Sequence, residues 1–296
     1  MEQPLVSILM AAYNQEQFIG EAIESVLAST YKNFELIIVD DCSPDNTYHI
    51  AAEYAKKDVR IRLYKNEKNL GDYPNRNRVA SYAKGKYLKY IDGDDAIYYW
   101  GLQVVVEMME RFPEAAYGLD SILQDDSRMF PYLLNPKATY ESVYLRRMSL
   151  FDKAPTSAII RRDVFACEGG FKPVKYSGDF EMWHRLAISY SVLVMPDGII
   201  WSRLHQNSES SKLRRNIAAM NYQYLLISRE FISMSQCPLD PTAKNKLVKV
   251  ICASQIKILI KLLLKLKIGK ILEIRRTDSL SMPKLIRMAF VDRFKN

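Results

Sequence analysis

A cluster of three carboxylates is the part of this sequence that points most directly to chemistry. Asp92, Asp94 and Asp95 lie within four residues, with Gly93 between them. Clustered carboxylates repel one another and resist desolvation, and a bound cation relieves both costs. Oxygen ligands suit a hard ion such as Mg²⁺ or Mn²⁺, which commonly bridges the phosphates of a nucleotide. The cluster predicts a metal–diphosphate site; the alternative is a solvated turn, because Gly and Asp are turn formers.

Alternating strands and helices are expected to position this cluster. Apolar runs predict the strands, and apolar stripes with helical spacing predict the helices. In chain order we expect strands over 6–12, 34–39, 59–64 and 86–91, and between them helices over 18–27, over 47–57 and up to 83. This repeated strand–helix order predicts an α/β fold, with a Rossmann-like, mostly parallel sheet flanked by helices.

Polar residues follow the predicted strands near their carboxyl ends, namely Tyr13, Asp41, Asn69 and Asp92. Ligands of open parallel sheets bind outside the carboxyl ends of the strands, so we expect one composite site. Each residue also has a structural alternative; Asp41, for example, could simply begin a turn. The sequence contains no Gly-x-Gly-x-x-Gly motif and no Gly-Lys-Ser/Thr loop, so the phosphates must be held by a metal and by arginine.

The sequence of these strands and of the loops that follow them resembles that of family 2 glycosyltransferases. The resemblance rests on several segments in order and at family spacing: 6–14, 25–47, 69–77, 83–87 and 92–95. It covers roughly residues 4 to 211. It implies the GT-A fold, a nucleotide-sugar donor, a divalent metal (Mn²⁺ or Mg²⁺) and inversion at the anomeric carbon.

The same resemblance implies roles for single residues. At the nucleobase the implied contacts are Ala11 and Tyr13, with Asp41 accepting from the uracil N–H and with Asn69 and Gly71 beside them. Arg76 is implied at the diphosphate or the nucleobase edge, and Asp92 near the ribose. Asp94 is the implied metal ligand, a role that Asp95 could share. The chain departs from the family at Asp72–Asn75, where small residues are common, and at Cys42, which replaces a smaller residue.

Asp179 is the predicted catalytic base. Sugar transfer to a hydroxyl needs a group that takes the acceptor proton as the oxygen attacks. Asp179 begins an expected helix that runs to 188, and it matches the family's acidic residue before an aromatic helix. The alternative is a helix cap, worth about 0.5–2 kcal/mol. Glu181 is the second candidate for the base.

His205 is the predicted third metal ligand, after Asp94 and Asp95. Family members carry an Arg-x-His segment after a strand, here expected over 198–201, and the resemblance implies that the histidine reaches the metal. Neutral imidazole suits Mn²⁺ better than Mg²⁺. The alternative is a satisfied structural histidine. His49 and His184 receive no role.

Length and composition bound the organisation of the chain. The 296 residues suit a catalytic domain over 1–211, with a nucleotide-binding half over 1–95 and an acceptor half over 96–211, and a helical basic region over 212–296. The four cysteines are widely spaced, which indicates neither a disulfide framework nor a zinc site. The first residues do not resemble a signal peptide, so we expect a cytoplasmic protein.

The positive charge is concentrated near the carboxyl terminus. Residues 244–296 hold 14 Lys/Arg and 3 Asp/Glu, a net charge of +11, which leaves −3 for the rest of a chain of net charge +8. Lys257, Lys261 and Lys265 share one expected helical face. The helix could lie on the anionic inner face of the plasma membrane, or it could pack on the catalytic domain or on a second subunit. Nucleic-acid binding is not expected, because the stripe lacks interleaved aromatic residues.

The resemblance, taken together with these features, implies an inverting, metal-dependent glycosyltransferase with a UDP-sugar donor and a saccharide or lipid-linked acceptor, in bacterial surface-polysaccharide assembly. One alternative is a sugar nucleotidyltransferase, which usually carries a Gly-rich, basic loop after its first strand; Ala11–Asn14 is not such a loop. The other alternative is a non-catalytic module that binds a nucleotide-sugar or a membrane. Asp94 and Asp179 argue against it.

Overall fold

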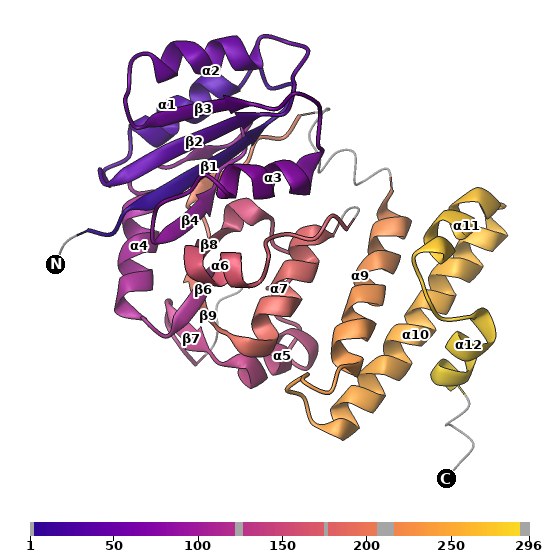
Figure 1. The fold of residues 1–296 in the computed structure, drawn as a ribbon. Helices are drawn as coiled ribbons and strands as arrows, with labels where there is room; N and C mark the ends of the chain where they lie inside the picture. The colour runs from indigo at the N-terminus through magenta and orange to yellow at the C-terminus, as the bar shows by residue number, and fades with distance from the viewer. Residues whose placement is uncertain (1–2, 122–126, 175–176, 206–215, 291–296) are drawn as a thin grey trace.

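A mixed eight-stranded sheet runs through the molecule, with strand order β3-β2-β1-β4-β8-β6-β9-β7 (Figure 1). The computed structural model describes residues 3–121, 127–174, 177–205 and 216–290. The strands of this sheet are β1 Val6–Ala12, β2 Phe34–Asp40, β3 Ile61–Lys65, β4 Tyr87–Tyr90, β6 Ala115–Ser121, β7 Tyr132–Leu134, β8 Ala158–Arg161 and β9 Ser191–Pro196. A second, two-stranded sheet pairs β5 Ala96–Ile97 with β10 Ile200–Trp201.

Helices cover both faces of the large sheet, as expected for a sheet whose central strands are buried on both faces. The helices are α1 Ile19–Leu27, α2 Thr47–Ala55, α3 Asp72–Ala80, α4 Gly101–Arg111, α5 Pro136–Tyr144, α6 Arg162–Cys167, α7 Gly178–Ser189, α9 Ile217–Ser233, α10 Pro241–Leu264, α11 Ile268–Arg276 and α12 Met282–Phe290. A 3₁₀ turn, η1 Pro155–Ser157, precedes β8. The α/β fold and the helical carboxyl-terminal part that the sequence predicts are confirmed.

Side-chain alternation along β1 explains why two layers of helices are needed. Ile8 and Met10 pack in one core cluster with residues of α1, α2 and α4. Leu9 points the other way and belongs to the cluster formed with α3, α6 and α7. Every residue of β2 is buried, so a strand at this position must be covered on both sides.

The strand directions bring the predicted site residues to one edge of the sheet. β1 pairs in parallel with both β2 and β4, and β2 pairs in parallel with β3. The carboxyl ends of these strands therefore share an edge, and Tyr13, Asp41 and Asp92 follow them there. This edge is called the carboxyl edge below.

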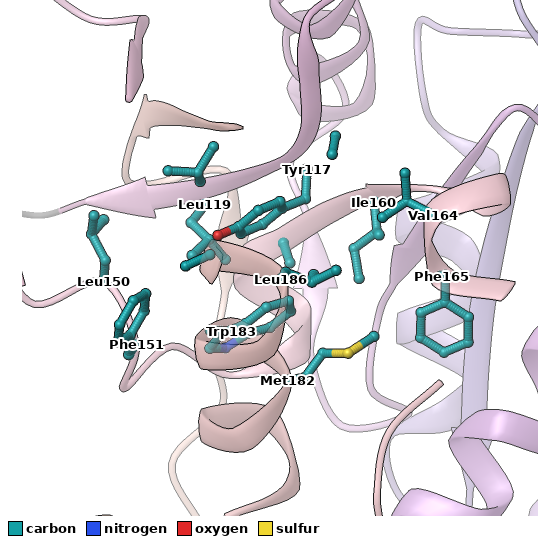
Figure 2. Packing of buried hydrophobic residues seen from close by; sticks show 14 of the residues in the cluster. Tyr117, Leu119, Leu150, Phe151, Ile160, Val164, Phe165, Met182, Trp183 and Leu186 are labelled. Carbon is teal, nitrogen blue, oxygen red and sulfur yellow. The ribbon is translucent and has the colours of Figure 1, made fainter. Parts of the chain in front are cut away.

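The buried aromatic and aliphatic cluster behind α7 fixes that helix on the sheet. Figure 2 shows Trp183 of α7 below Tyr117 of β6, with Phe151 on one side of the indole and Met182 on the other. The Tyr117 and Trp183 rings are stacked, with centroids 6.2 Å apart, and the indole N–H of Trp183 donates to the carbonyl of Lys153 at 2.7 Å. Full burial of Trp183 anchors α7, and with it the position of Asp179.

Helices α9 to α12 form a further packed group beside α5 and α7 (Figure 1). Their core is a separate cluster that includes Tyr222 of α9, Cys252 of α10 and Leu285 of α12. A buried ion pair between Arg229 and Asp278, 2.7 Å long, ties α9 to the turn before α12. The predicted boundary between 211 and 212 lies outside the described residues. Within the described helices, no segment is long and apolar enough to span a membrane.

Helix α10 differs from its sequence-based description in one respect. The lysine pattern suggests a continuous helix through Lys265, but α10 ends at Leu264. Leu266 has a left-handed backbone, with φ of 53°. The amide of Lys267 donates to the carbonyl of Leu262 at 3.0 Å, and that of Leu266 donates to Leu263 at 2.9 Å. This is the double hydrogen-bond pattern that closes many helix carboxyl ends.

Candidate active site

The carboxylate cluster forms a tight turn directly after β4. The amide of Asp95 donates to the carbonyl of Asp92 at 3.1 Å and closes the turn. The side chain of Asp92 accepts two hydrogen bonds from Arg76, at 2.7 and 3.1 Å. A bidentate pair of this kind fixes the orientation of both groups.

Arg76 comes from α3, which begins at the carboxyl edge just after Gly71. Its guanidinium is buried between Asp92 and Asp72, with Nε 2.7 Å from the Asp72 carboxylate. These two carboxylates raise the pKa of Arg76 against the opposing effect of its burial. Arg76 therefore remains a fixed positive charge beside the cluster, and Asp72, within the segment that departs from the family pattern, helps to hold it.

Asp94 and His205 meet across the edge although 111 positions separate them in the chain. Nε2 of His205 lies 2.8 Å from Oδ2 of Asp94. The imidazole also packs against the Phe18 ring, with centroids 4.9 Å apart. A small cavity of about 90 Å³ opens beside the pair and is lined by Asn14, Glu16, Gln17, Phe18, Asp45 and His205.

Asp95 is turned toward the segment that leads to His205. Its carboxylate accepts from the amide of Arg203 at 3.0 Å and from the hydroxyl of Ser202 at 3.4 Å. Burial, reinforced by the negative charges of Asp92 and Asp94, raises the pKa of Asp95 to about 7. Asp95 therefore holds its proton more readily than an exposed aspartate does.

The donor set at the edge suits a divalent cation that shares its coordination with a substrate. Asp94 offers carboxylate oxygens and His205 offers an imidazole nitrogen, which Mn²⁺ accepts. In the described part of the chain, no three His, Cys, Asp or Glu side chains gather as a metal cluster. Ions of this class are commonly bound by one or two protein ligands plus phosphate and water oxygens. Asp94 and His205 fit that pattern, and a direct bond from Asp95 stays a prediction.

Asp41 organises the loop between β3 and α3. Its buried carboxylate accepts from the side chain of Asn66 at 2.7 Å and from the amides of Leu70 and Gly71 at 2.8 and 2.9 Å. A carboxylate has about four acceptor positions, so these three bonds leave about one unused. Gly71 has φ of 87°, a conformation that favours glycine, and it turns the chain into α3.

The remaining predicted nucleotide-site residues lie along the same edge. Tyr13 is 48% exposed at the end of β1 and is free to face a ligand. Ala11 is half-buried one residue before the last position of that strand, and Asn69 is exposed in the loop that Asp41 holds. Their contacts with a donor stay predictions.

Asp179 lies inside the first turn of α7 rather than at its cap, which is Ser177. Oδ1 of Asp179 accepts from the hydroxyl of Tyr73 at 3.0 Å and from the amide of Phe180 at 2.8 Å. Burial raises the pKa of Asp179 to about 6, against the lowering effect of these hydrogen bonds and of the Arg76 charge. A carboxylate with this pKa is ionised near neutral pH and still basic enough to take a proton.

Glu181, the second candidate for the base, forms ion pairs with two basic side chains. Its buried carboxylate is paired with Arg185 at 3.0 Å and with Lys172 at 2.9 Å. Glu181 is thus part of an ion-pair network, and its role as a base stays a prediction.

Helix α3 connects the two halves of the site. Tyr73 bonds to Asp179, and one turn later Arg76 bonds to Asp92. The sequence did not single out Tyr73 or Asp72; the one signal was that residues 72–75 depart from the family pattern. Two of the departing residues thus take part in the link, Tyr73 by bonding Asp179 and Asp72 by holding Arg76.

A family model described as glycosyl transferase family 2 matches residues 7–169, more than half of the chain. The chain belongs to this family. The match ends before Asp179 and His205, so their assignment depends on the geometry above. A curated relative, the Escherichia coli UDP-Glc:alpha-D-GlcNAc-diphosphoundecaprenol beta-1,3-glucosyltransferase WfgD, is 35% identical over 144 residues, which are 48% of this chain and 56% of the relative. The chain thus spans about half the length of that family 2 protein.

Solved structures extend the similarity to the fold. TarS of S. aureus in complex with UDP-GlcNAc superposes with a TM-score of 0.63 at 18% identity, covering 83% of this chain and 71% of TarS. The mannosyltransferase PcManGT of Pyrobaculum calidifontis, in complex with GDP-Man and Mn²⁺, gives 0.64 at 16% identity, covering 100% of this chain and 89% of PcManGT. At these identities the similarity establishes the GT-A fold of this family 2 member and nothing further.

Proposed function

We propose that this chain is a metal-dependent, inverting glycosyltransferase that moves a sugar from a nucleotide-sugar to an acceptor hydroxyl. One observation carries the proposal: helix α3 links a partly buried carboxylate with a pKa of about 6, Asp179, to the turn that holds Asp94 against His205. A base and an ion-binding pair on one edge are the two parts that such a transfer requires.

Asp94 and His205 would hold the divalent ion, with Asp95 as the further predicted ligand. When bound, the ion supplies positive charge that stabilises the departing diphosphate. Arg76, fixed between Asp72 and Asp92, adds a permanent positive charge beside the same position. Tyr13 and Ala11 would face the nucleobase of the donor, and Asp41 would accept a hydrogen bond from its N–H. Asn69 and Gly71 would complete the wall of this nucleobase pocket.

Asp179 would remove the proton of the acceptor hydroxyl. The acceptor oxygen forms a bond to the anomeric carbon from the face opposite the leaving group, and the bond from that carbon to the diphosphate oxygen breaks. The hydroxyl proton moves to the Asp179 carboxylate, and the nucleoside diphosphate departs with the bonding electrons. Attack from the opposite face inverts the configuration at the anomeric carbon.

A UDP-sugar is the first donor to test, because the remaining acceptor position of Asp41 matches a uracil N–H. The name of the E. coli relative gives UDP-glucose as its donor and a diphosphoundecaprenol-linked sugar as its acceptor. PcManGT was solved with GDP-Man, so guanosine donors belong in the same panel. We propose a saccharide or lipid-linked saccharide acceptor in surface-polysaccharide assembly.

Thermal unfolding with a panel of nucleotide-sugars, with and without Mn²⁺, tests this function. A ligand at about 100 times its Kd stabilises the folded state by about 2.7 kcal/mol, which is a shift of several degrees for a protein of this size. We expect at least one nucleotide-sugar to raise the Tm more with Mn²⁺ than without it. If none does so at any concentration tested, the proposal fails.

A further inference from the structure

The corner between α10 and α11 contains a contiguous group of exposed apolar side chains. We define the α10–α11 corner as residues 257–272. Seven consecutive residues within it, 263–269, are exposed. Four of the seven are apolar, and Leu264 and Leu266 are 79% and 84% exposed. Scattered exposed apolar residues need no explanation, but a contiguous group does.

Packing of α10 on its neighbours does not account for this group. The face that α10 presents to α9 and α12 contains Cys252, Gln255, Ile256, Leu259 and Leu262, all of them buried. The exposed apolar residues of the corner are Ile260, Leu263, Leu264, Leu266, Ile268 and Leu272. Helix α10 is therefore apolar on a second face that the described part of the chain leaves uncovered.

Leu266 is an independent sign that the corner is not optimised for folding alone. It occupies the left-handed position that closes α10, with φ of 53°, where glycine or asparagine is usual. A leucine there carries a conformational cost that glycine avoids. Despite that cost, a large apolar side chain occupies this exposed position.

The charged residues within the corner are all positive, and the nearest acidic residue, Glu273, directly follows it. The corner contains five lysines and no acidic residue: Lys257, Lys261, Lys265, Lys267 and Lys270. The first four are exposed. A surface that combines exposed leucines with lysines complements an anionic lipid surface, where the apolar groups enter the acyl boundary and the lysines meet phosphate head groups.

We propose that the α10–α11 corner docks the protein on an anionic bilayer, with Leu264 and Leu266 inserted at the lipid surface. This inference is independent of the proposed catalytic function, because every proposed catalytic residue precedes position 206. It combines the two alternatives that the sequence leaves open for the basic helix. One face of α10 packs on protein, and only the corner contacts the membrane.

Co-sedimentation of the full chain with vesicles tests the proposal. The vesicles contain about equal parts of phosphatidylglycerol and phosphatidylcholine, and vesicles of phosphatidylcholine alone serve as the reference. We expect binding to the anionic vesicles at low ionic strength and weaker binding near 0.15 M salt, where charges are screened beyond about 8 Å. Absence of binding to anionic vesicles at low salt would overturn the proposal.

Leu266→Gly separates lipid binding from folding. Glycine suits the left-handed position, so we expect an unchanged or higher Tm together with vesicle binding weakened by about tenfold, the effect of withdrawing one leucine from an apolar environment. Val59→Ser is the matched control, since Val59 is 98% exposed and lies far from the corner in sequence. Wild-type binding by Leu266→Gly would contradict the proposal.

The charge component has its own pair of variants. Lys261→Gln with Lys265→Gln should weaken binding by about 25-fold, or about fivefold for each lysine near an anionic surface. Lys56→Gln with Lys57→Gln, two exposed lysines at the end of α2, should change it little. If light scattering instead finds a dimer that Leu266→Gly converts to a monomer, and vesicles are not bound, the corner is a contact between two copies and the lipid proposal is wrong.

Discussion

The hydroxyl of Tyr73 donates a hydrogen bond to Oδ1 of Asp179, with 3.0 Å between the two oxygens. The two residues are 106 positions apart, on α3 and α7. The ring of Tyr73 also leaves no room for a side chain at residue 178, because a Cβ on Gly178 would lie 2.7 Å from it. The tyrosine thus positions the carboxylate that we propose as the base, and several predictions concern this pair and its surroundings.

Tyr73→Phe should change the pH dependence of turnover. The hydroxyl stabilises ionised Asp179, so its loss should raise the pKa of this carboxyl above its present value of about 6. A hydrogen bond to a charged group is worth about 1.5–3 kcal/mol, so we expect the acidic limb of the pH–kcat profile to move up by about one pH unit. Tyr82→Phe, which alters a tyrosine stacked on Tyr64 instead, should leave the limb in place. An unmoved limb in Tyr73→Phe would exclude the positioning role.

Asp179→Asn should lower turnover by about 10²-fold or more while donor binding stays nearly unchanged, because a general base acts in the chemical step. The measurement is the release of nucleoside diphosphate together with calorimetric donor affinity. Turnover within a few-fold of wild type would mean that Asp179 has only a structural role.

The same substitution should stabilise the folded protein. The folded-state pKa of Asp179 lies above the ordinary value of 3.8, so the ionised carboxylate disfavours folding once the pH rises through about 6. Near pH 7.5 we expect Asp179→Asn to raise the free energy of unfolding by about 1 kcal/mol, or about 2 °C in Tm. At pH 4 the gain should vanish, because the folded protein then carries this group protonated. A Tm that falls at pH 7.5 would contradict the assigned pKa direction.

His184 should make the fold sensitive to acid. Its imidazole is fully buried among Phe151, Phe180 and Phe231, and this burial lowers its pKa from 6.5 to about 3. Below pH 6.5 the unfolded chain binds a proton that the folded protein does not, so stability falls as the pH falls, by about 2 kcal/mol at pH 5 relative to pH 7.5. His184→Phe should flatten this part of the profile.

Urea unfolding at pH 7.5 and pH 5 measures how far the free energy of unfolding falls with acid in wild type and in His184→Phe. His49→Gln changes an exposed histidine on α2 and should leave the wild-type pH dependence intact. If His184→Phe folds but loses stability between pH 7.5 and 5 as steeply as wild type, the acid sensitivity originates elsewhere.

The amino-terminal fold could be predicted because its strands are buried on both faces. β1 and β2 are mostly apolar and almost wholly buried, and α1 between them carries a clear apolar stripe. The region around β6 and β8 gave no comparable signal. β6 contains small and polar residues, and β8 joins the sheet antiparallel to both β4 and β6, a pairing that depends on contacts distant in sequence.

Some residues of the candidate site could likewise be predicted from the sequence, whereas others depend on tertiary contacts. Residues that follow strands, such as Asp41 and Asp94, could be located from sequence because strand direction determines which edge they reach. The Tyr73–Asp179 bond could not, because it depends on how α3 and α7 pack. The pairing of Asp95 with the backbone of Arg203 is likewise a tertiary contact.

The most direct test of the central claim compares donor binding and donor turnover in three proteins: wild type, Asp94→Asn and Asp179→Asn. The donor is the nucleotide-sugar that gives the largest Mn²⁺-dependent thermal shift, and nucleoside diphosphate release is measured with Mn²⁺ present. We predict that Asp94→Asn loses both Mn²⁺-dependent binding and release, whereas Asp179→Asn keeps binding and loses release. Release at the wild-type rate by both variants would contradict the account.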